Sequence, residues 1–386
     1  MDRPPLLAFS HVRWDGVYQR PQNVMTRMGL RRSVLFVEEP MLGDGEPWLE
    51  TMPVAPGVRV CRPHLANGGP AFGPAQLADV ESMLNAFMDH ENISDHAAWL
   101  WTPAAVKLAR ALEPRAIIYD CTDELSAFPD VPAEYESELL AHADAVLTSG
   151  PGIFRARSDS HPFVRCFPNS VDVAHFARAT QSQEPEDQEP LARPRLGYFG
   201  VIDERVDFRI LDALALAHPE WEIVLVGPAV RIDPATLPRH PNLHYIGPCG
   251  HADLPRYLSG WDLGILPLVT GDATRFLNPT QVLEYLAAER PVVSTPLDDV
   301  VELHGDIAYL GDGPEAFVSA CEEAIGASLE ERDVRSARAR RQLKRTSWDE
   351  TVRRMDEILH YLGDFGRSRE SVVPVRVPWT YEARMS

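Results

Sequence analysis

A segment near residue 280 combines groups that could hold a phosphorylated ligand. Residues 276–288 read Phe-Leu-Asn-Pro-Thr-Gln-Val-Leu-Glu-Tyr-Leu-Ala-Ala. We expect a helix that begins near Thr280, and a helix start points amide groups and a positive dipole end at an anion. Asn278 and Thr280 add side-chain donors, while the Glu284 carboxylate, one turn inside, suits two hydrogen bonds from a ribose diol. The segment therefore predicts a site for a nucleoside phosphate.

Glycines and one arginine follow the expected strands in the same half of the chain. In an open α/β domain, ligands bind beyond the carboxyl ends of the strands, so these positions are the ones to inspect. Arg205 lies in the first such loop, where a guanidinium could neutralise the charge that builds on a departing diphosphate. A surface ion pair is the alternative role for this side chain. We predict that the ligand contacts Gly200, Arg205, Gly227, Pro248, Cys249, Asn278, Pro279, Thr280, Gln281 and Glu284.

A second group of polar and aromatic residues follows the first expected strand. Residues 10–22 read Ser-His-Val-Arg-Trp-Asp-Gly-Val-Tyr-Gln-Arg-Pro-Gln. Aromatic faces with nearby hydrogen-bond donors are typical of carbohydrate sites, so we expect His11, Trp14, Gln19 and Arg20 to contact a second substrate. Capping or core packing is the alternative for His11, and an ordinary helix-start arginine is the alternative for Arg20.

Carboxylates also lie at the carboxyl end of a later strand, at Asp120 and Asp123. Either could orient a substrate hydroxyl or accept its proton, although Asp123 or Thr122 could instead cap the next helix. We name Arg205, His11 and Asp120 as the candidate catalytic residues, and we assign Asp123 to the second substrate.

The elements that must position these residues alternate between strand and helix, and they do so twice. This alternation is typical of βαβ units around parallel sheets flanked by helices. A polar, acidic and proline-bearing stretch, 177–194, separates the halves and predicts a linker. We expect domains at 1–176 and 195–350, and residues 351–386 as a terminal helix and tail that return toward the first domain. Strands are expected at 6–10, 33–37, 58–62, 98–101, 116–120, 145–149 and 163–167, then at 195–199, 222–226, 243–246, 263–266, 291–295 and 307–310.

Composition narrows the function classes. The chain has 386 residues and a formal net charge of −20, which opposes binding to nucleic acid. A basic stretch at 332–345 is the local exception, and such blocks are usually solvated helix faces. No apolar run is long enough to span a bilayer, no secretion signal is recognisable, and the five cysteines show no C-x-x-C pair. We expect a cytoplasmic protein, and a peripheral position at the inner membrane face stays open.

The segment 276–295 resembles the donor-site signature of the retaining group 1 (family 4-like) glycosyltransferases, and 221–267 is similar to the same family. The pattern Trp14-Asp15 with Gln19 to Gln22 resembles a bacterial polysaccharide-assembly branch of it. The resemblance implies two facing Rossmann-like domains, the GT-B fold. It also implies transfer of a sugar from a nucleoside diphosphate donor, UDP-linked by family frequency, to an acceptor hydroxyl with retention. No compact Asp-x-Asp pair suggests a cation, so neither metal nor other cofactor is expected.

This chain departs from the family pattern in the segments that would bind the donor. Val201 and Phe276 stand where the family carries a basic residue and a glutamate, and Glu289 stands where a glycine is usual. Because Val201 and Phe276 replace expected polar residues, a non-catalytic sugar- or nucleotide-binding subunit is kept as an alternative. A nucleotide-sugar epimerase is a second alternative, because such enzymes share this two-domain fold. The nucleobase, the sugar, the acceptor and the oligomeric state stay open.

Overall fold

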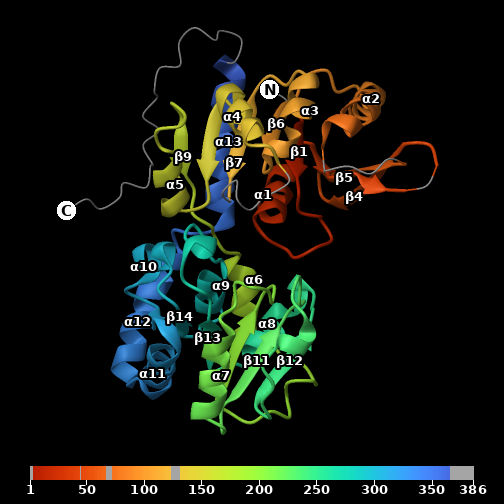
Figure 1. The fold of residues 1–386 in the computed structure, drawn as a ribbon. Helices are drawn as coiled ribbons and strands as arrows, with labels where there is room; N and C mark the ends of the chain where they lie inside the picture. The colour runs from red at the N-terminus through yellow and green to blue at the C-terminus, as the bar shows by residue number, and fades with distance from the viewer. Residues whose placement is uncertain (1–2, 44, 67–71, 123–130, 366–386) are drawn as a thin grey trace. The chain divides into compact units, whose positions relative to one another are not determined.

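The computed structural model describes residues 3–43, 45–66, 72–122 and 131–365. The chain divides into two compact units, the first from residues 1–168 and 348–386 and the second from residues 169–347 (Figure 1). Each unit is an α/β structure built on one sheet.

The first unit joins a largely parallel sheet to helices from both ends of the chain. Its strands are β1 (Leu6–Ser10), β2 (Val34–Glu38), β3 (Met41–Leu42), β4 (Trp48–Ala55), β5 (Val58–Leu65), β6 (Ala97–Leu100), β7 (Ile117–Cys121), β8 (Ala145–Thr148) and β9 (Val164–Cys166). Its helices are α1 (Arg20–Gly29), α2 (Pro74–His90), α3 (Val106–Ala111), α4 (Ala133–His142), α5 (Pro151–Arg157) and α13 (Trp348–Phe365).

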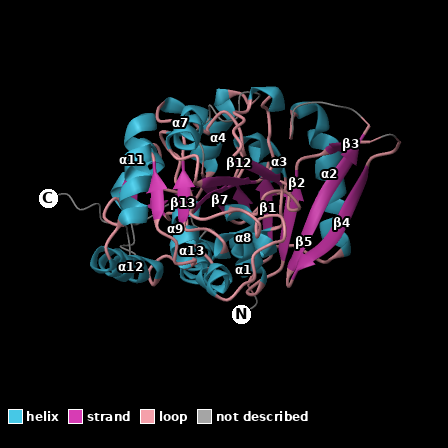
Figure 2. Cartoon of the chain, turned by 90° about the horizontal axis from the view of Figure 1, so that it is seen from below, coloured by secondary structure: helices cyan, strands magenta, loops and turns pink. Residues whose placement is uncertain are grey.

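The strand order of this sheet is β3-β5-β2-β1-β6-β7-β8-β9, and β4 pairs with β5 in antiparallel direction. Figure 2 shows β4 at the outer edge of the sheet. The neighbours of β1 are β2 and β6, so the strand order reverses there and the loop after β1 opens at a topological switch point. That loop is the stretch from His11 to Gln19.

The terminal helix α13 belongs to this unit. Its Trp348, Val352 and Met355 are buried in the same core as Val24 and Met28 of α1. The amphipathic pattern of α13 supplies the reason, since an apolar stripe must pack against another element. The prediction that the C-terminal helix packs back on the N-terminal domain is confirmed.

The second unit is a six-stranded parallel sheet with helices, within the part of the chain that the structure describes. Its strands are β10 (Arg195–Phe199), β11 (Glu222–Val226), β12 (Leu243–Gly247), β13 (Leu263–Leu266), β14 (Val292–Ser294) and β15 (Tyr309–Leu310). Its helices are α6 (Val173–Ala177), α7 (Phe208–Ala217), α8 (Leu254–Ser259), α9 (Gln281–Ala287), α10 (Asp298–His304), α11 (Gly313–Gly326) and α12 (Leu329–Leu343).

The strand order β12-β11-β10-β13-β14-β15 is the doubly wound Rossmann order, with its reversal between β10 and β13. The strands β10, β13 and β14 are fully buried, as in a parallel sheet covered on both faces, whereas the edge strand β12 is mostly half-buried. The predicted fold class, α/β with two Rossmann-like domains, is thus confirmed.

The segment 177–194 differs from the linker that its polarity predicted. Gln188 is fully buried, donates to the carbonyl of Tyr257 at 3.0 Å and accepts from the Trp261 indole at 2.8 Å. The segment is therefore part of the second unit, and the division between the units falls after Pro168. Composition misleads here because a single amide can satisfy two buried polar groups while its neighbours stay in solvent.

The sequence analysis did not predict the edge strand β4, because its residues show little alternation of apolar and polar side chains. In the structure most of them are half-buried. Among the described helices, none combines the length and apolar character needed to cross a membrane.

Candidate active site

Two glycines bring the backbone close together at the switch point of the second unit. Gly200 follows β10 with φ of 145°, and Gly227 follows β11 with φ of 150°. A side chain on Gly227 would overlap the carbonyl of Gly200, and one on Gly200 would meet the Tyr198 hydroxyl at 2.9 Å. Both positions therefore require glycine, and they leave exposed backbone where a ligand can approach.

Helix α9 begins beside these glycines. Gln281 Nε2 lies 3.4 Å from the carbonyl oxygen of Phe199, and the Phe199 amide donates to the Tyr285 hydroxyl at 3.1 Å. These two bonds tie the first turns of α9 to the end of β10. The helix was expected to begin near Thr280, and Thr280 is its N-cap residue.

Glu284 lies within the first turns of α9 and is half-buried. Burial raises the pKa of its carboxyl to about 8, against a smaller opposing effect of a hydrogen bond with Thr280. A carboxyl that is costly to ionise in the free protein is suited to a ligand that supplies hydrogen-bond donors.

Arg205 is oriented by a buried carboxylate. Its guanidinium bonds both oxygens of Asp203, with Nη2 at 2.7 Å from Oδ2, while Asp203 is fully buried and the Arg205 side chain is 39% exposed. Arg231, from the loop after β11, lies 4.0 Å from the same Asp203 oxygen. Sequence reasoning missed Arg231, which brings a second cation to the loop where Val201 replaces the basic residue of the family.

The other predicted donor residues are placed differently from one another. Asn278 is buried, and its carbonyl accepts from the Asn169 side chain at 2.8 Å. Pro279 is also buried, whereas Pro248 is exposed. Burial raises the pKa of the half-buried Cys249 thiol to about 11, with smaller contributions from Asp253 and Asp187. The thiol is therefore protonated and unreactive near neutral pH.

A pocket of about 220 Å³ lies between the loops that follow β13 and β14. It is lined by Thr270, Gly271, Asp272, Thr274, Arg275, Pro296, Leu297 and Asp298. The Arg275 guanidinium sits 5.3 Å above the Phe276 ring. The sequence analysis predicted none of these residues. The signal that could have found them is their place in the loops after β13 and β14.

Glu289 occupies a position with left-handed backbone, φ of 57°. Such a conformation favours glycine, so Glu289 holds a turn after α9 that a glycine would adopt with less strain.

In the first unit, the loop after β1 is held by a buried carboxylate. Glu38, at the end of β2, is fully buried and accepts from the Trp14 amide at 2.7 Å and from Arg13 Nη1 at 3.0 Å. Gln22 donates to the carbonyl oxygen of Arg13 at 3.1 Å. These bonds fix the loop in one conformation, with His11 half-buried at its start.

Arg20 and Asp120 form a buried ion pair, which corrects the expectation that they face a substrate. Arg20 Nη2 lies 2.8 Å from Asp120 Oδ1, with the two side chains only 4% and 0% exposed. The Asp120 carboxylate also accepts from the indoles of Trp99 at 3.3 Å and Trp101 at 2.9 Å. A carboxylate surrounded by these donors has no access to a substrate proton, so its role is structural.

The remaining acceptor candidates also separate. Trp14 is half-buried and packs edge-on against Phe36, with ring centroids 5.0 Å apart, and its contact with an acceptor stays a prediction. Gln19 is exposed just before α1, and its backbone N–H donates to Gln22 Oε1 at 3.1 Å. Asp123 lies outside the described residues.

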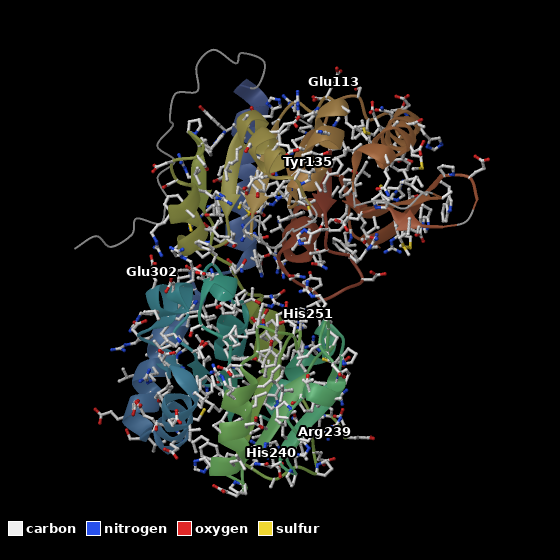
Figure 3. All side chains as sticks on the ribbon, viewed as in Figure 1. Glu113, Tyr135, Arg239, His240, His251 and Glu302 are labelled. Carbon is white, nitrogen blue, oxygen red and sulfur yellow. The ribbon has the colours of Figure 1, made fainter. Side chains whose placement is uncertain are left out.

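A stacked histidine pair lies near Cys249. His251, labelled in Figure 3, stacks on His175 with ring centroids 4.2 Å apart, and its carbonyl contacts His175 Nε2 at 3.0 Å. Burial lowers the pKa of His175. The pair fixes the loop after β12 against α6.

Residues 193–326 match the family of group 1 glycosyl transferases. A candidate teichuronic acid biosynthesis glycosyltransferase from Bacillus subtilis (strain 168), TuaH, is 25% identical over 255 residues. The match covers 60% of this chain and 64% of that relative, so the chain spans slightly under two thirds of its length.

Solved structures resemble the whole chain. Sucrose-phosphate synthase from Thermosynechococcus elongatus has a TM-score of 0.69 at 16% identity, covering 95% of this chain and all of that one. Anabaena HepE, solved in complex with UDP and glucose, has a TM-score of 0.65 at 14% identity, covering 93% of this chain and all of that one. At these identities the likeness concerns the fold. The chain therefore has the GT-B fold, and residues 193–326 of its second unit match the group 1 glycosyl transferase family.

Proposed function

We propose that this protein transfers a sugar from a nucleoside diphosphate donor to an acceptor hydroxyl. The observation that carries the proposal is the meeting of Gly200, Gly227 and the start of α9 at the switch point of a domain that matches group 1 glycosyltransferases. Uridine is the proposed base, because a structural neighbour was solved with UDP. Retention of configuration rests on the family resemblance.

The proposed chemistry is electrostatic. As the bond between the sugar and the diphosphate breaks, negative charge grows on the departing phosphate. The Arg205 guanidinium, already held by Asp203, and the amide groups at the start of α9 would stabilise that charge without reorganising. Arg231 would add a second positive charge at the same loop.

Glu284 is proposed to accept hydrogen bonds from the ribose of the donor. The pKa of about 8 means that the carboxyl is mostly protonated in the free protein at neutral pH, so ribose hydroxyls would favour its ionised form on binding.

The pocket beside Arg275 is proposed to take the sugar of the donor. Its volume of about 220 Å³ lies below the roughly 300–1,000 Å³ typical of sites for whole ligands, so it suits a fragment. Thr270, Thr274 and Asp298 could form hydrogen bonds with sugar hydroxyls in this pocket. These bonds would take the place of those made by the family's glutamate, whose position Phe276 occupies in this chain.

The reaction is proposed to need no metal ion, since the cations named above could carry the charge. Addition of a chelator should leave the rate unchanged, and loss of turnover that Mg²⁺ or Mn²⁺ restores would refute this part. The cytoplasm, with or without peripheral attachment to the membrane, remains the proposed location, which cell fractionation can test.

The test of the function is product analysis with purified full-length protein and a panel of UDP-sugars. Transfer, or slow release of UDP by hydrolysis of the donor, supports the proposal. Interconversion of two UDP-sugars without acceptor would instead identify an epimerase. UDP-sugar binding with no turnover toward any acceptor would favour a non-catalytic subunit, the reading that Val201 and Phe276 keep open.

A further inference from the structure

An exposed aromatic pair stands at the end of β4 and β5 in the first unit. Trp48 is 52% exposed, and its indole stacks on the His64 imidazole with ring centroids 4.1 Å apart and an interplanar angle of 7°. The two residues are direct cross-strand partners. Because the imidazole covers one face of the indole and the residue stays half exposed, the indole is held in a defined orientation with apolar surface open to solvent.

Polar side chains surround this pair. Glu50 Oε2 lies 3.0 Å from His64 Nε2, and Glu50 is the cross-strand partner of Arg62. Arg62 contacts three carboxylates, those of Glu38 at 2.6 Å, Asp15 at 3.3 Å and Glu50 at 3.5 Å. The rim therefore offers both donors and acceptors, while its charges largely compensate one another.

The aromatic pair lies at the carboxyl end of the sheet, the end at which the loop from His11 to Gln19 follows β1. His64 lies near the carboxyl end of β5, which runs parallel to β2 and therefore ends on the same side of the sheet. The antiparallel β4 begins on that side, with Trp48 opposite His64. Arg62 connects the pair to the loop through Asp15. Ligands of open α/β sheets bind at this edge.

We propose that Trp48 and His64 form a binding platform for an uncharged pyranose ring of the acceptor, with Glu50 and Arg62 bonding its hydroxyls. The role of this saccharide as the acceptor rests on the proposed function, whereas the binding of a saccharide rests on the Trp48–His64 pair itself. A pyranose presents an apolar face of C–H groups and a rim of hydroxyls, which matches an open indole with donors and acceptors beside it. Three carboxylates facing two guanidinium groups, those of Arg13 and Arg62, disfavour an anionic sugar.

The test uses full-length protein labelled with ¹⁵N at the tryptophan indoles and observed by NMR. The Trp48 signal is assigned from its loss in Trp48→Ala. Cellotetraose, maltotetraose and chitotetraose are the neutral probes, and tetragalacturonate is the anionic one. We expect the Trp48 signal to move with at least one neutral probe, and affinity for that probe to fall by about tenfold or more in Trp48→Ala.

Two further variants sharpen the result. Trp48→Phe should retain part of the affinity because it keeps an aromatic face. Leu30→Ala, which truncates an apolar side chain 70% exposed elsewhere in the same unit, should bind as the unaltered protein does. No Trp48 shift with any neutral probe at millimolar concentration, equal affinity in Trp48→Ala, or preference for tetragalacturonate would overturn the inference.

This outcome is separable from that of the proposed function. A Trp48 shift in a protein that turns over no UDP-sugar would leave the platform standing and refute the transfer activity. Sugar transfer without a Trp48 shift would do the reverse.

Discussion

The carboxyl edges of the two sheets use the same positions in opposite ways. In the first unit, polar residues near the carboxyl ends of the strands form ion pairs with little exposed surface, as Asp120 of β7 with Arg20 and Glu38 of β2 with Arg62. In the second unit, glycines bring backbone against backbone, and Arg205 stays partly exposed on its buried partner Asp203. A polar residue at the carboxyl end of a strand therefore indicates this end of the sheet, and its burial decides whether it can contact a ligand or stabilises the fold.

The largest effect should come from breaking the buried pair of the first unit. Asp120→Ala would leave the Arg20 charge buried without its carboxylate and the indoles of Trp99 and Trp101 without an acceptor. We expect a loss of about 3–5 kcal/mol in the free energy of unfolding, measured by urea denaturation.

Asp349→Ala is the matched control, since its carboxylate also pairs with an arginine, Arg27, but is 83% exposed. It should unfold as the unaltered protein does. If Asp120→Asn kept full stability while turnover vanished, Asp120 would be catalytic and the contrast between the two edges would fail.

Gly227→Ala tests the edge of the second unit. The new side chain would combine unfavourable backbone at φ of 150° with overlap onto the Gly200 carbonyl. We expect a loss of about 2–4 kcal/mol in the free energy of unfolding and weaker nucleotide binding, followed by thermal unfolding with and without UDP.

Gly313→Ala separates the two causes. Gly313 also has positive φ, 79°, but a side chain there would meet nothing within 4 Å. Its cost should be only about 1 kcal/mol, from backbone strain alone, with UDP binding intact. Equal losses in both variants would show that the close approach at Gly227 is unimportant.

Glu284→Gln should have a smaller, pH-dependent effect. The pKa of about 8 in the folded protein lies above the ordinary 4.5, so the unfolded chain releases this proton first and stability falls as pH rises between these values. The variant should therefore gain about 1–3 kcal/mol over the unaltered protein at pH 8 and little at pH 4.

Nucleotide binding should show the reverse dependence. UDP affinity of the unaltered protein should strengthen from pH 6 to pH 9 as Glu284 ionises, and the Glu284→Gln variant should lose that dependence, as measured by calorimetry. A pH-independent difference between the two proteins in both measurements would remove Glu284 from the proposed ribose site.

Much of the fold was predictable because it depends on local patterns. Buried parallel strands are apolar runs, and the runs that end at Phe199 and Val226 match β10 and β11. The terminal helix was expected within residues 351–386, and the structure has α13 at Trp348–Phe365. In contrast, β4 has no such pattern, and the segment around Gln188 is polar although it packs on the second unit.

In the candidate site, the backbone features were the predictable part, whereas contact of these residues with a ligand stays a prediction. Gly200 and Gly227 were found because a glycine after a strand has few other uses, and the structure places them in contact. Side-chain roles were less predictable, because partners come from distant parts of the sequence: Arg20 meets Asp120 one hundred residues away. The sequence analysis named Trp14 as a candidate and not Trp48, yet Trp14 packs on Phe36 while Trp48 is exposed.

The central claim is that the nucleotide binds at the switch point of the second unit. Hydrogen–deuterium exchange of the full-length protein, with and without saturating UDP, tests it most directly. We predict slower exchange in the segments 199–206, 227–231 and 270–285, and no change around His11 to Gln19. Protection confined to the first unit, or no protection in these segments despite measured UDP binding, would contradict the account.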